Sequence, residues 1–232
     1  MKRINSKEIK KVLYGVILSD GCIDQSRRFD LYNIHEEYVI LISNYLNSIT
    51  NTRTSIYKKY DKRFTDSIGY RLTTNGNKYF SKFREMFYTN GRKTLTKYIC
   101  DRLDFQALAH VWMCDGYMYH AKNPKENKIQ NIGYFCLEGF PRDELQLFVN
   151  RLSELGINSR LEKVAWGFGF RPKISGIDLQ KFVDKIYPYI IPCFQYKTFL
   201  YYKSSKYLDS DLQSAEQFVK YYERIEDIVR HS

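Results

Sequence analysis

Hydrophobic positions along the chain follow two alternating periods, and their order repeats. Apolar residues three and four apart predict helices, whereas alternation predicts strands. In residues 1–100 the pattern predicts a helix over 7–20 and two short extended pieces, the second over 29–34. A helix over 36–49, two strands over 53–60 and 67–74 and a helix over 77–88 follow. In residues 101–208 it predicts the same order over 103–115, 117–120, 130–137, 141–155, 157–164, 168–175 and 178–187. Both halves read α-β-β-α-β-β-α, which predicts an α+β fold.

Local identities support an internal duplication. Lys82-Phe83 in the first half corresponds to Lys181-Phe182 in the second, and Lys93-Thr94 corresponds to Lys197-Thr198. We therefore expect a pseudo-twofold molecule with half-domains 1–100 and 101–208. Residues 209–232 follow as an extension, where apolar spacing over 209–231 predicts one more helix that packs on the body or meets a partner.

Two of the predicted helices end in the same dipeptide, Asp20-Gly21 and Asp115-Gly116. We expect each glycine to stop its helix in a left-handed conformation at the C′ position. Each aspartate would then lie at a helix C-terminus, where the helix dipole disfavours a carboxylate and favours a cation. Mg²⁺ held between the two carboxylates would fit, because it prefers oxygen ligands. The alternative is that Asp-Gly is an ordinary turn at the end of a core helix.

The charge distribution points to a polyanionic partner. The chain of 232 residues carries a net charge of +11, with +10 in residues 1–100, +4 in 101–208 and −3 in 209–232. The excess positive charge therefore belongs to the folded body. Together with 21 tyrosines it favours nucleic acid binding, although a soluble basic protein without such a partner would show the same balance.

The five cysteines include no CxxC pair and are odd in number, so neither a zinc site nor a disulfide framework is predicted. Reduced thiols indicate an intracellular compartment, either cytoplasmic or organellar. No apolar run approaches the ~20 residues that a membrane span needs, and polar residues follow Met1-Lys2-Arg3, so we expect neither a membrane segment nor a signal peptide.

The two Asp-Gly segments resemble the motif of the LAGLIDADG homing endonucleases, in particular the single-chain group that carries two copies. The first segment matches at Leu13, Gly15, Ile17, Asp20 and Gly21, and the second keeps Leu108, Ala109, Asp115 and Gly116. Further similar stretches are 86–93, 112–116 and 190–197. The resemblance covers about residues 7–203, and the order and spacing of these segments make it specific.

The resemblance implies that the motif helices pack side by side between the half-domains. Their close contact needs small residues, a place that Gly15 takes in the first helix. His110 stands at the matching place in the second helix, which leaves Ala109 as the nearest small residue. We interpret His110 as a polar residue of this interface, with a catalytic role as the alternative.

The resemblance also implies that the strands of each half form a curved antiparallel sheet, and that the two sheets form a saddle over duplex DNA. Alternation in the strands agrees, because one face of each is polar and basic while the other is apolar. The predicted DNA-binding residues are Arg53, Ser55, Tyr57, Lys59, Ser67, Arg71 and Thr73 in the first half, and Asn158, Arg160, Glu162, Arg171, Lys173 and Ser175 in the second. The alternative is a sheet face that is merely solvated.

The chemistry that the resemblance implies is hydrolysis of both DNA strands across the minor groove, leaving short 3′ overhangs. Asp20 and Asp115 would be catalytic metal ligands, assisted by the backbone carbonyls of Ser19 and Cys114. Mg²⁺ is the expected ion, with Mn²⁺ as a substitute and Ca²⁺ supporting binding only. Lys93 and Lys197 would activate water or stabilise the transition state, or else simply contact phosphate.

A further polar residue near each acid is expected in that family, and Asn33, His35 and Glu138 are the candidates here. Because the duplication already supplies two half-sites, we expect a monomer. Two other functions fit the same fold: a maturase that binds its intron RNA, and a DNA-binding regulator without cleavage. Both predicted acids are present, which favours the site-specific DNA endonuclease.

Overall fold

The computed structural model describes residues 5–198, except for 61–67, 124–127, 166 and 168. The helix predicted over 209–231, the end of the second half-domain and Ser67 lie outside the described residues. Within the described part, no helix is long and apolar enough to cross a membrane.

The first half contains the predicted helices and strands in the predicted order. They are α1 (Ser6–Leu18), β1 (Cys22–Ile23), β2 (Phe29–Asn33), α2 (Glu36–Asn47), β3 (Thr54–Tyr60), β4 (Ile68–Thr74), the 3₁₀ helix η1 (Lys78–Phe80) and α3 (Ser81–Phe87). A small hairpin, β5 (Tyr88–Thr89) and β6 (Arg92–Lys93), and the short helix α4 (Lys97–Cys100) then lead to the second half. None of these three connecting elements has a periodic pattern that the sequence could reveal.

The second half repeats that order. It consists of α5 (Phe105–Asp115), β7 (Gly116–Asn123), β8 (Lys128–Phe135), α6 (Arg142–Glu154), β9 (Arg160–Lys163), β10 (Phe170–Ser175) and α7 (Gly176–Ile186), followed by the 3₁₀ helices η2 (Tyr187–Tyr189) and η3 (Pro192–Thr198). The hairpin of β7 and β8 is longer than predicted. Strand β9 is shorter than the predicted 157–164, because the amide of Asn158 binds Asp178 at the start of α7 instead of extending the strand.

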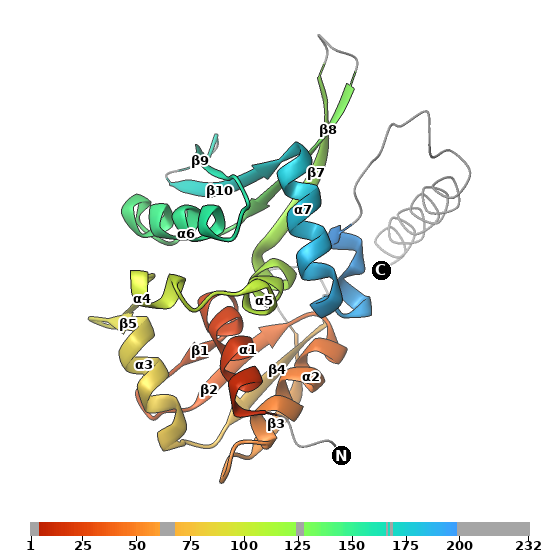
Figure 1. Ribbon diagram of the computed structural model, residues 1–232. Helices are drawn as coiled ribbons and strands as arrows, with labels where there is room; N and C mark the ends of the chain where they lie inside the picture. Colours follow the sequence, from red (N-terminus) through yellow and green to blue (C-terminus); the bar gives the residue numbers. More distant parts are fainter. Residues whose placement is uncertain (1–4, 61–67, 124–127, 166, 168, 199–232) are drawn as a thin grey trace.

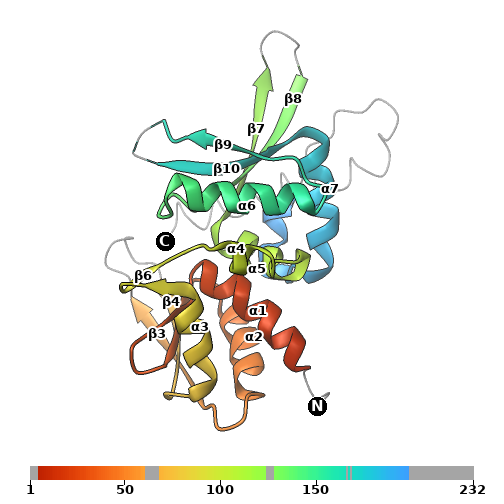
Figure 2. The ribbon, with the colours of Figure 1, turned by 60° about the vertical axis from the view of Figure 1, so that its left-hand side comes forward.

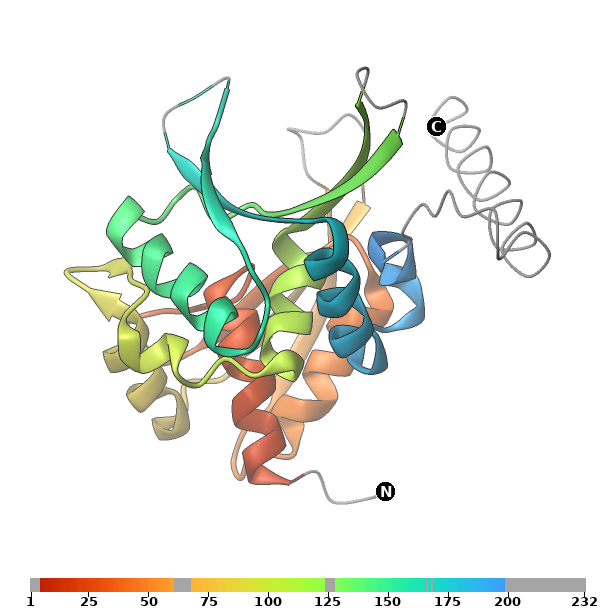
Figure 3. The ribbon, with the colours of Figure 1, turned by 45° about the horizontal axis from the view of Figure 1, so that its top comes forward.

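The two sheets have equivalent topology, which confirms the predicted duplicated α+β fold. Their strand orders are β1-β2-β4-β3 and β7-β8-β10-β9, and every neighbouring pair is antiparallel. Figure 1 shows the two halves one above the other, with α1 and α5 between them, and Figure 2 shows α6 along one face of the second sheet. The curvature of that sheet is clear in Figure 3.

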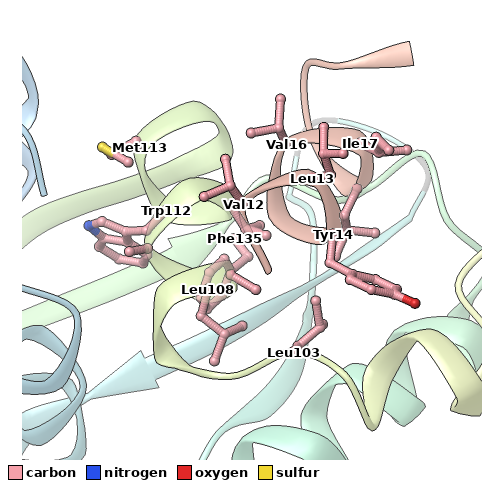
Figure 4. Packing of buried hydrophobic residues seen from close by; sticks show 14 of the residues in the cluster. Val12, Leu13, Tyr14, Val16, Ile17, Leu103, Leu108, Trp112, Met113 and Phe135 are labelled. Atoms are coloured by element: carbon pink, nitrogen blue, oxygen red, sulfur yellow. The ribbon is translucent and has the colours of Figure 1, made fainter. Parts of the chain in front are cut away.

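Helices α1 and α5 form the centre of the molecule because both are apolar on nearly every side. Each begins at a side-chain cap: Asn5 accepts from the backbone N–H of Lys7 at 2.9 Å, and Asp104 accepts from Ala107 at 3.0 Å. Their buried side chains form one cluster with Phe135 of β8 (Figure 4). A buried core of this kind fixes where both helices end, and therefore where Asp20 and Asp115 lie.

Gly15 lies in close contact with the other motif helix. A Cβ at Gly15 would stand 2.1 Å from the carbonyl oxygen of Ala107 and 2.8 Å from the Cβ of His110. Glycine is therefore required here by space, as predicted. The small residue opposite it is Ala107 and not Ala109, because Ala107 lies one helical turn before the position that the motif alignment indicated.

Candidate functional site

Each motif helix leads directly into a strand through its glycine, and the expected left-handed conformation is wrong. Gly116 has φ −77° and ψ 138°, and Gly21 is not among the residues with positive φ. Both glycines are required by space instead. An added Cβ would lie 2.3 Å from the Trp112 carbonyl at Gly116 and 2.8 Å from the Val16 carbonyl at Gly21. The tight exit places each aspartate at the junction of helix and sheet.

Two lysines at corresponding positions close the C-terminal ends of the two helices. The ammonium of Lys93 donates to the carbonyls of Ser19 and Gly21 at 2.8 and 3.0 Å. The ammonium of Lys197 donates to those of Met113 and Cys114 at 2.7 and 3.2 Å. These contacts supply the positive charge that a helix C-terminus favours. Burial lowers the pKa of both lysines, and the nearby acids oppose this shift.

The carboxylate of Asp20 contacts groups from both halves. Asn33 on β2 donates to it at 3.2 Å. The surrounding protein desolvates the carboxylate and raises its pKa, although the neighbouring Cys114 and Asn33 side chains and the charges of both lysines act in the opposite direction. The contact with Cys114 brings the end of α1 against the end of α5.

The carboxylate of Asp115 is the more strongly perturbed of the two acids. Burial and the charge of Asp20 raise the pKa of Asp115 to about 7, with the two lysines offsetting part of the effect and Glu138 adding to it. Lys93 and Lys197 direct their hydrogen bonds to backbone carbonyls, and no ion pair joins either lysine to either acid among the described residues. Two mutually repelling carboxylates of this kind fit a divalent cation, which would favour both charged forms.

The expected carbonyl ligands are already engaged by the lysines, since those of Ser19 and Cys114 both accept from an ammonium group. The Cys114 side chain is itself held in place, because its thiol donates to the Tyr38 hydroxyl at 3.5 Å. A cation at either carbonyl would therefore share that oxygen with a lysine, whereas the side-chain carboxylates of Asp20 and Asp115 could hold a cation without such sharing.

The three candidate polar residues lie in different surroundings. Asn33 contacts Asp20, as described above, and also accepts from the backbone N–H of His35 at 3.0 Å. Glu138 lies close enough to Asp115 to raise its pKa, and 4.0 Å from Arg171. The His35 ring lies against Phe194 of η3, with ring centroids 4.4 Å apart. Asn33 and Glu138 are thus the polar neighbours of the two acids, and His35 is not.

His110 is a buried residue of the helix interface, with 3% of its surface exposed. Its Nδ1 is 3.0 Å from the hydroxyl of Tyr38, which is itself fully buried. Burial lowers the pKa of His110 to about 3, so the imidazole is neutral at physiological pH. These contacts support the interpretation as an interface residue over a catalytic role.

In the first sheet, the predicted polar row lies on a single face. The register of β3 with β4 places Ser55 opposite Thr73 and Tyr57 opposite Arg71, with Lys59 two residues further along. Arg71 also pairs with Asp30 of β2, with 2.6 Å between Nη2 and Oδ2. Arg53 precedes β3, where its backbone N–H donates to the Asn75 side chain at 2.7 Å. Arg71 and the backbone of Arg53 therefore already have partners within the first half, which the sequence alone does not reveal.

In the second sheet, Arg160, Glu162, Arg171 and Lys173 share a face through the register of β9 with β10. Lys173 forms an ion pair with Glu162 at 2.8 Å, and both partners are partly exposed. Ser175 continues this face at the end of β10, while Ile174 points the other way into the core. Asn158 lies outside the row, as its contacts with Asp178 require.

Sequence reasoning missed a column of tyrosines on this face of the second sheet. The ring of Tyr119 lies between those of Tyr117 and Tyr134, with centroids 6.0 Å from each. The guanidinium of Arg171 lies 3.8 Å from the centroid of the Tyr134 ring. The alternation of Tyr117 and Tyr119 over two residues was the signal that could have revealed them.

Comparison with known families identifies the chain. The model of the LAGLIDADG DNA endonuclease family matches residues 10–182, which is most of the described structure. The chain therefore belongs to this family. The match spans both Asp-Gly segments and the sheets that follow them.

Several solved structures are similar in fold. The homing endonuclease I-WcaI, bound to its DNA recognition sequence, has 20% identity and a TM-score of 0.72 over 85% of this chain and 88% of that chain. The meganuclease I-SmaMI, bound to uncleavable DNA, has 12% identity and a TM-score of 0.55 over 84% and 88%. Full-length DUF199/WhiA from Thermatoga maritima has 14% identity and a TM-score of 0.50 over 93% and 69%. At these identities the similarity establishes the fold.

Proposed function

We propose that this protein is a site-specific endonuclease that hydrolyses both strands of duplex DNA with the help of a divalent metal ion. The observation that carries the proposal is the convergence of Asp20 and Asp115 at the ends of α1 and α5, where the charge of Asp20 helps to raise the pKa of Asp115. Membership of a DNA endonuclease family and the fold shared with I-WcaI support the same activity.

Asp20 and Asp115 are the residues that would hold the metal, with Mg²⁺ as the expected ion, Mn²⁺ as a substitute and Ca²⁺ supporting binding only. When bound, such an ion would stabilise the attacking and leaving oxygens of an in-line displacement. Asn33 orients the Asp20 carboxylate through its hydrogen bond of 3.2 Å. Glu138 occupies the neighbourhood of Asp115, so the two acids have unlike polar neighbours.

Lys93 and Lys197 hold the helix ends in place and bring positive charge beside the acids. Because each ammonium already binds two backbone carbonyls, we assign these lysines first to positioning and to electrostatic stabilisation of a phosphate, and not to proton abstraction from water. Burial lowers the pKa of both lysines, while the charges of Asp20 and Asp115 act to raise it.

The polar faces of the two sheets are the proposed DNA-binding surface. Arginine and lysine side chains suit phosphates and guanine edges, and Tyr117, half exposed on β7, adds an apolar contact. The internal duplication supplies one half-site from each sheet, so we propose that a single chain binds one target. An obligate dimer by sedimentation, both free and on DNA, would contradict this.

A randomised duplex library tests the activity directly. The purified protein is incubated with the library and Mg²⁺, and the ends of the cut molecules are sequenced. We expect a single enriched site, cut on both strands with 3′ overhangs. Enrichment by binding without cleavage would indicate a DNA-binding regulator, and stimulation of intron RNA splicing without duplex cleavage would indicate a maturase.

A further inference from the structure

A second cluster of metal-binding side chains lies away from the two acids, where α2 of the first half meets η3 of the second. These segments are about 150 residues apart in the sequence and lie side by side in Figure 1 and Figure 3. The ring of Phe194 on η3 packs between His35, at 4.4 Å, and Tyr38, at 5.3 Å. This aromatic contact holds the backbone of η3 against the first turn of α2.

Three different ligand types converge beside this contact. One ring nitrogen of His35, a carboxylate oxygen of Glu37 and the Sγ of Cys193 all lie within 4.8 Å of one another. Among the described residues, it is the only group of three or more histidine, cysteine or acidic side chains with this spacing. The cluster therefore differs in chemistry from the Asp20 and Asp115 pair, which offers oxygen alone.

His35 has a polar atom that nothing in the described structure satisfies. Its Nε2 is buried and has no hydrogen-bond partner. The residue stands at the N-cap of α2, yet its side chain makes no capping hydrogen bond. A buried ring nitrogen without a partner is unfavourable, and a metal ion is one of the groups that can bind it.

We propose that His35, Glu37 and Cys193 bind a Zn²⁺ ion that joins the two halves of the molecule. Zinc accepts nitrogen, sulfur and oxygen ligands in one tetrahedral site, whereas Mg²⁺ strongly prefers oxygen. A neutral imidazole, a thiolate and a carboxylate together balance the ion's two positive charges, which keeps the cost of placing it at the helix N-terminus small. Water takes the fourth position.

The geometry needs only side-chain movement. Bonds of about 2.0–2.3 Å in a tetrahedron place the ligand atoms about 3.5 Å apart. The three ligand atoms now lie within 4.8 Å of one another, so they must move about 1 Å closer together. Glu37 is exposed and free to rotate towards the other two residues. The thiol proton of Cys193 is displaced by the ion, as for any zinc-bound cysteine.

The ion would also fix both sides of the candidate active site. Cys193 and Lys197 lie on the same 3₁₀ helix, and Lys197 closes the end of α5 while its carbonyl accepts from Trp112 Nε1 at 2.9 Å. On the other side, the backbone N–H of His35 donates to Asn33, which donates to Asp20. A zinc ion between His35 and Cys193 would therefore join the 3₁₀ helix that carries Lys197 to the hydrogen-bonded residues that hold Asp20.

Metal binding to the full chain tests the proposal without reference to cleavage. The metal-free protein is titrated with Zn²⁺ in the presence of excess Mg²⁺, and with Co²⁺ to detect thiolate-to-cobalt charge-transfer absorption. We expect one Zn²⁺ per chain, the thiolate absorption band, and a rise in Tm on adding Zn²⁺. Cys193→Ser should remove the band and weaken binding by at least about 100-fold, because the loss of an outer partner of a ligand already costs about 10–100-fold.

The exposed cysteine Cys136 provides the matched control, so Cys136→Ser should keep the band, the stoichiometry and the rise in Tm. Glu37→Gln, an exposed substitution that leaves the core intact, should weaken Zn²⁺ binding as Cys193→Ser does. The proposal is overturned if the wild-type protein binds no Zn²⁺ under excess Mg²⁺, or if Cys193→Ser and Glu37→Gln bind it as tightly as Cys136→Ser. Because none of these readouts involves DNA, the result is independent of the proposed endonuclease activity.

Discussion

Lys93 and Lys197 occupy corresponding positions, 104 residues apart, and each donates two hydrogen bonds to backbone carbonyls at the C-terminal end of one motif helix or just after it. The sequence indicated both lysines as candidates for water activation or phosphate contact. The contacts assign them a prior task, which is to neutralise the negative end of a helix dipole beside an acid that the same dipole repels. The two lysines therefore make two adjacent carboxylates tolerable before any cation binds.

Replacing either lysine should cost both stability and cleavage. Lys93→Met or Lys197→Met keeps the length of the side chain and removes two charged hydrogen bonds at a helix end, so we expect a loss of about 1–2 kcal/mol in the free energy of unfolding. Urea unfolding measures it. Lys97→Met, which removes only the exposed pair with Asp101, should cost no more than about 0.5 kcal/mol. Equal losses in all three variants would contradict the capping role.

The helix interface should not tolerate a side chain at Gly15. In Gly15→Ala the new Cβ meets the Ala107 carbonyl, which is backbone and cannot rotate away, so α1 and α5 must separate. We expect a loss of about 1–3 kcal/mol, as for other overpacked cores, and a lower Tm in thermal unfolding. Gly139→Ala is the control, because a Cβ there meets nothing within 4 Å. A Tm for Gly15→Ala that matches the control would show that the interface is looser than described.

Buried His110 should make the protein less stable at acid pH. Its pKa is about 3 in the folded protein, against 6.5 for the free side chain, so between these values the unfolded chain binds the extra proton. The contribution of His110 to the free energy of unfolding is thus fully present above pH 6.5. It is lost as pH falls towards 3, by about 1.4 kcal/mol per pH unit.

The substitution His110→Asn separates this contribution from that of the other titrating groups. Asparagine keeps a polar atom near the position of Nδ1 but does not titrate, so the acid slope of the free energy of unfolding should become shallower by about one proton. An identical slope in wild type and His110→Asn would mean that His110 protonates freely in the folded state.

DNA binding through the sheet faces should depend steeply on salt. Each phosphate neutralised by the protein contributes about 0.9 to the slope of log affinity against log salt concentration. Lys59 is exposed on the polar face of β3, so Lys59→Gln should reduce the slope by about one contact. Lys185→Gln, on α7 away from that face, should not change it. A flat salt dependence in the wild type would contradict the polar sheet faces as the DNA-binding surface.

The duplicated fold could be predicted because it is encoded in local periodicity and in two repeated dipeptides. Features that depend on what meets in space could not. The glycines after Asp20 and Asp115 do not take the left-handed conformation expected at the end of a helix. A close backbone carbonyl and the strand that begins at once decide their conformation instead. The contact of Asn158 with Asp178 and the converging ligands His35 and Cys193 join segments that are far apart in the chain, and no period in the sequence marks them.

The central claim is that Asp20 and Asp115 hold the metal while the sheets hold the DNA. Asp20→Asn and Asp115→Asn keep the shape of each side chain and remove the charge that attracts Mg²⁺. Nicking and double-strand cleavage of the selected target are measured in Mg²⁺, beside a binding assay in Ca²⁺, with the surface substitution Asp101→Asn as control. We predict that cleavage falls at least about 100-fold in each active-site variant while specific binding is kept or tightens slightly, because a repulsive carboxylate has been removed. If either variant cuts like Asp101→Asn, that aspartate merely ends its helix and the assignment is wrong.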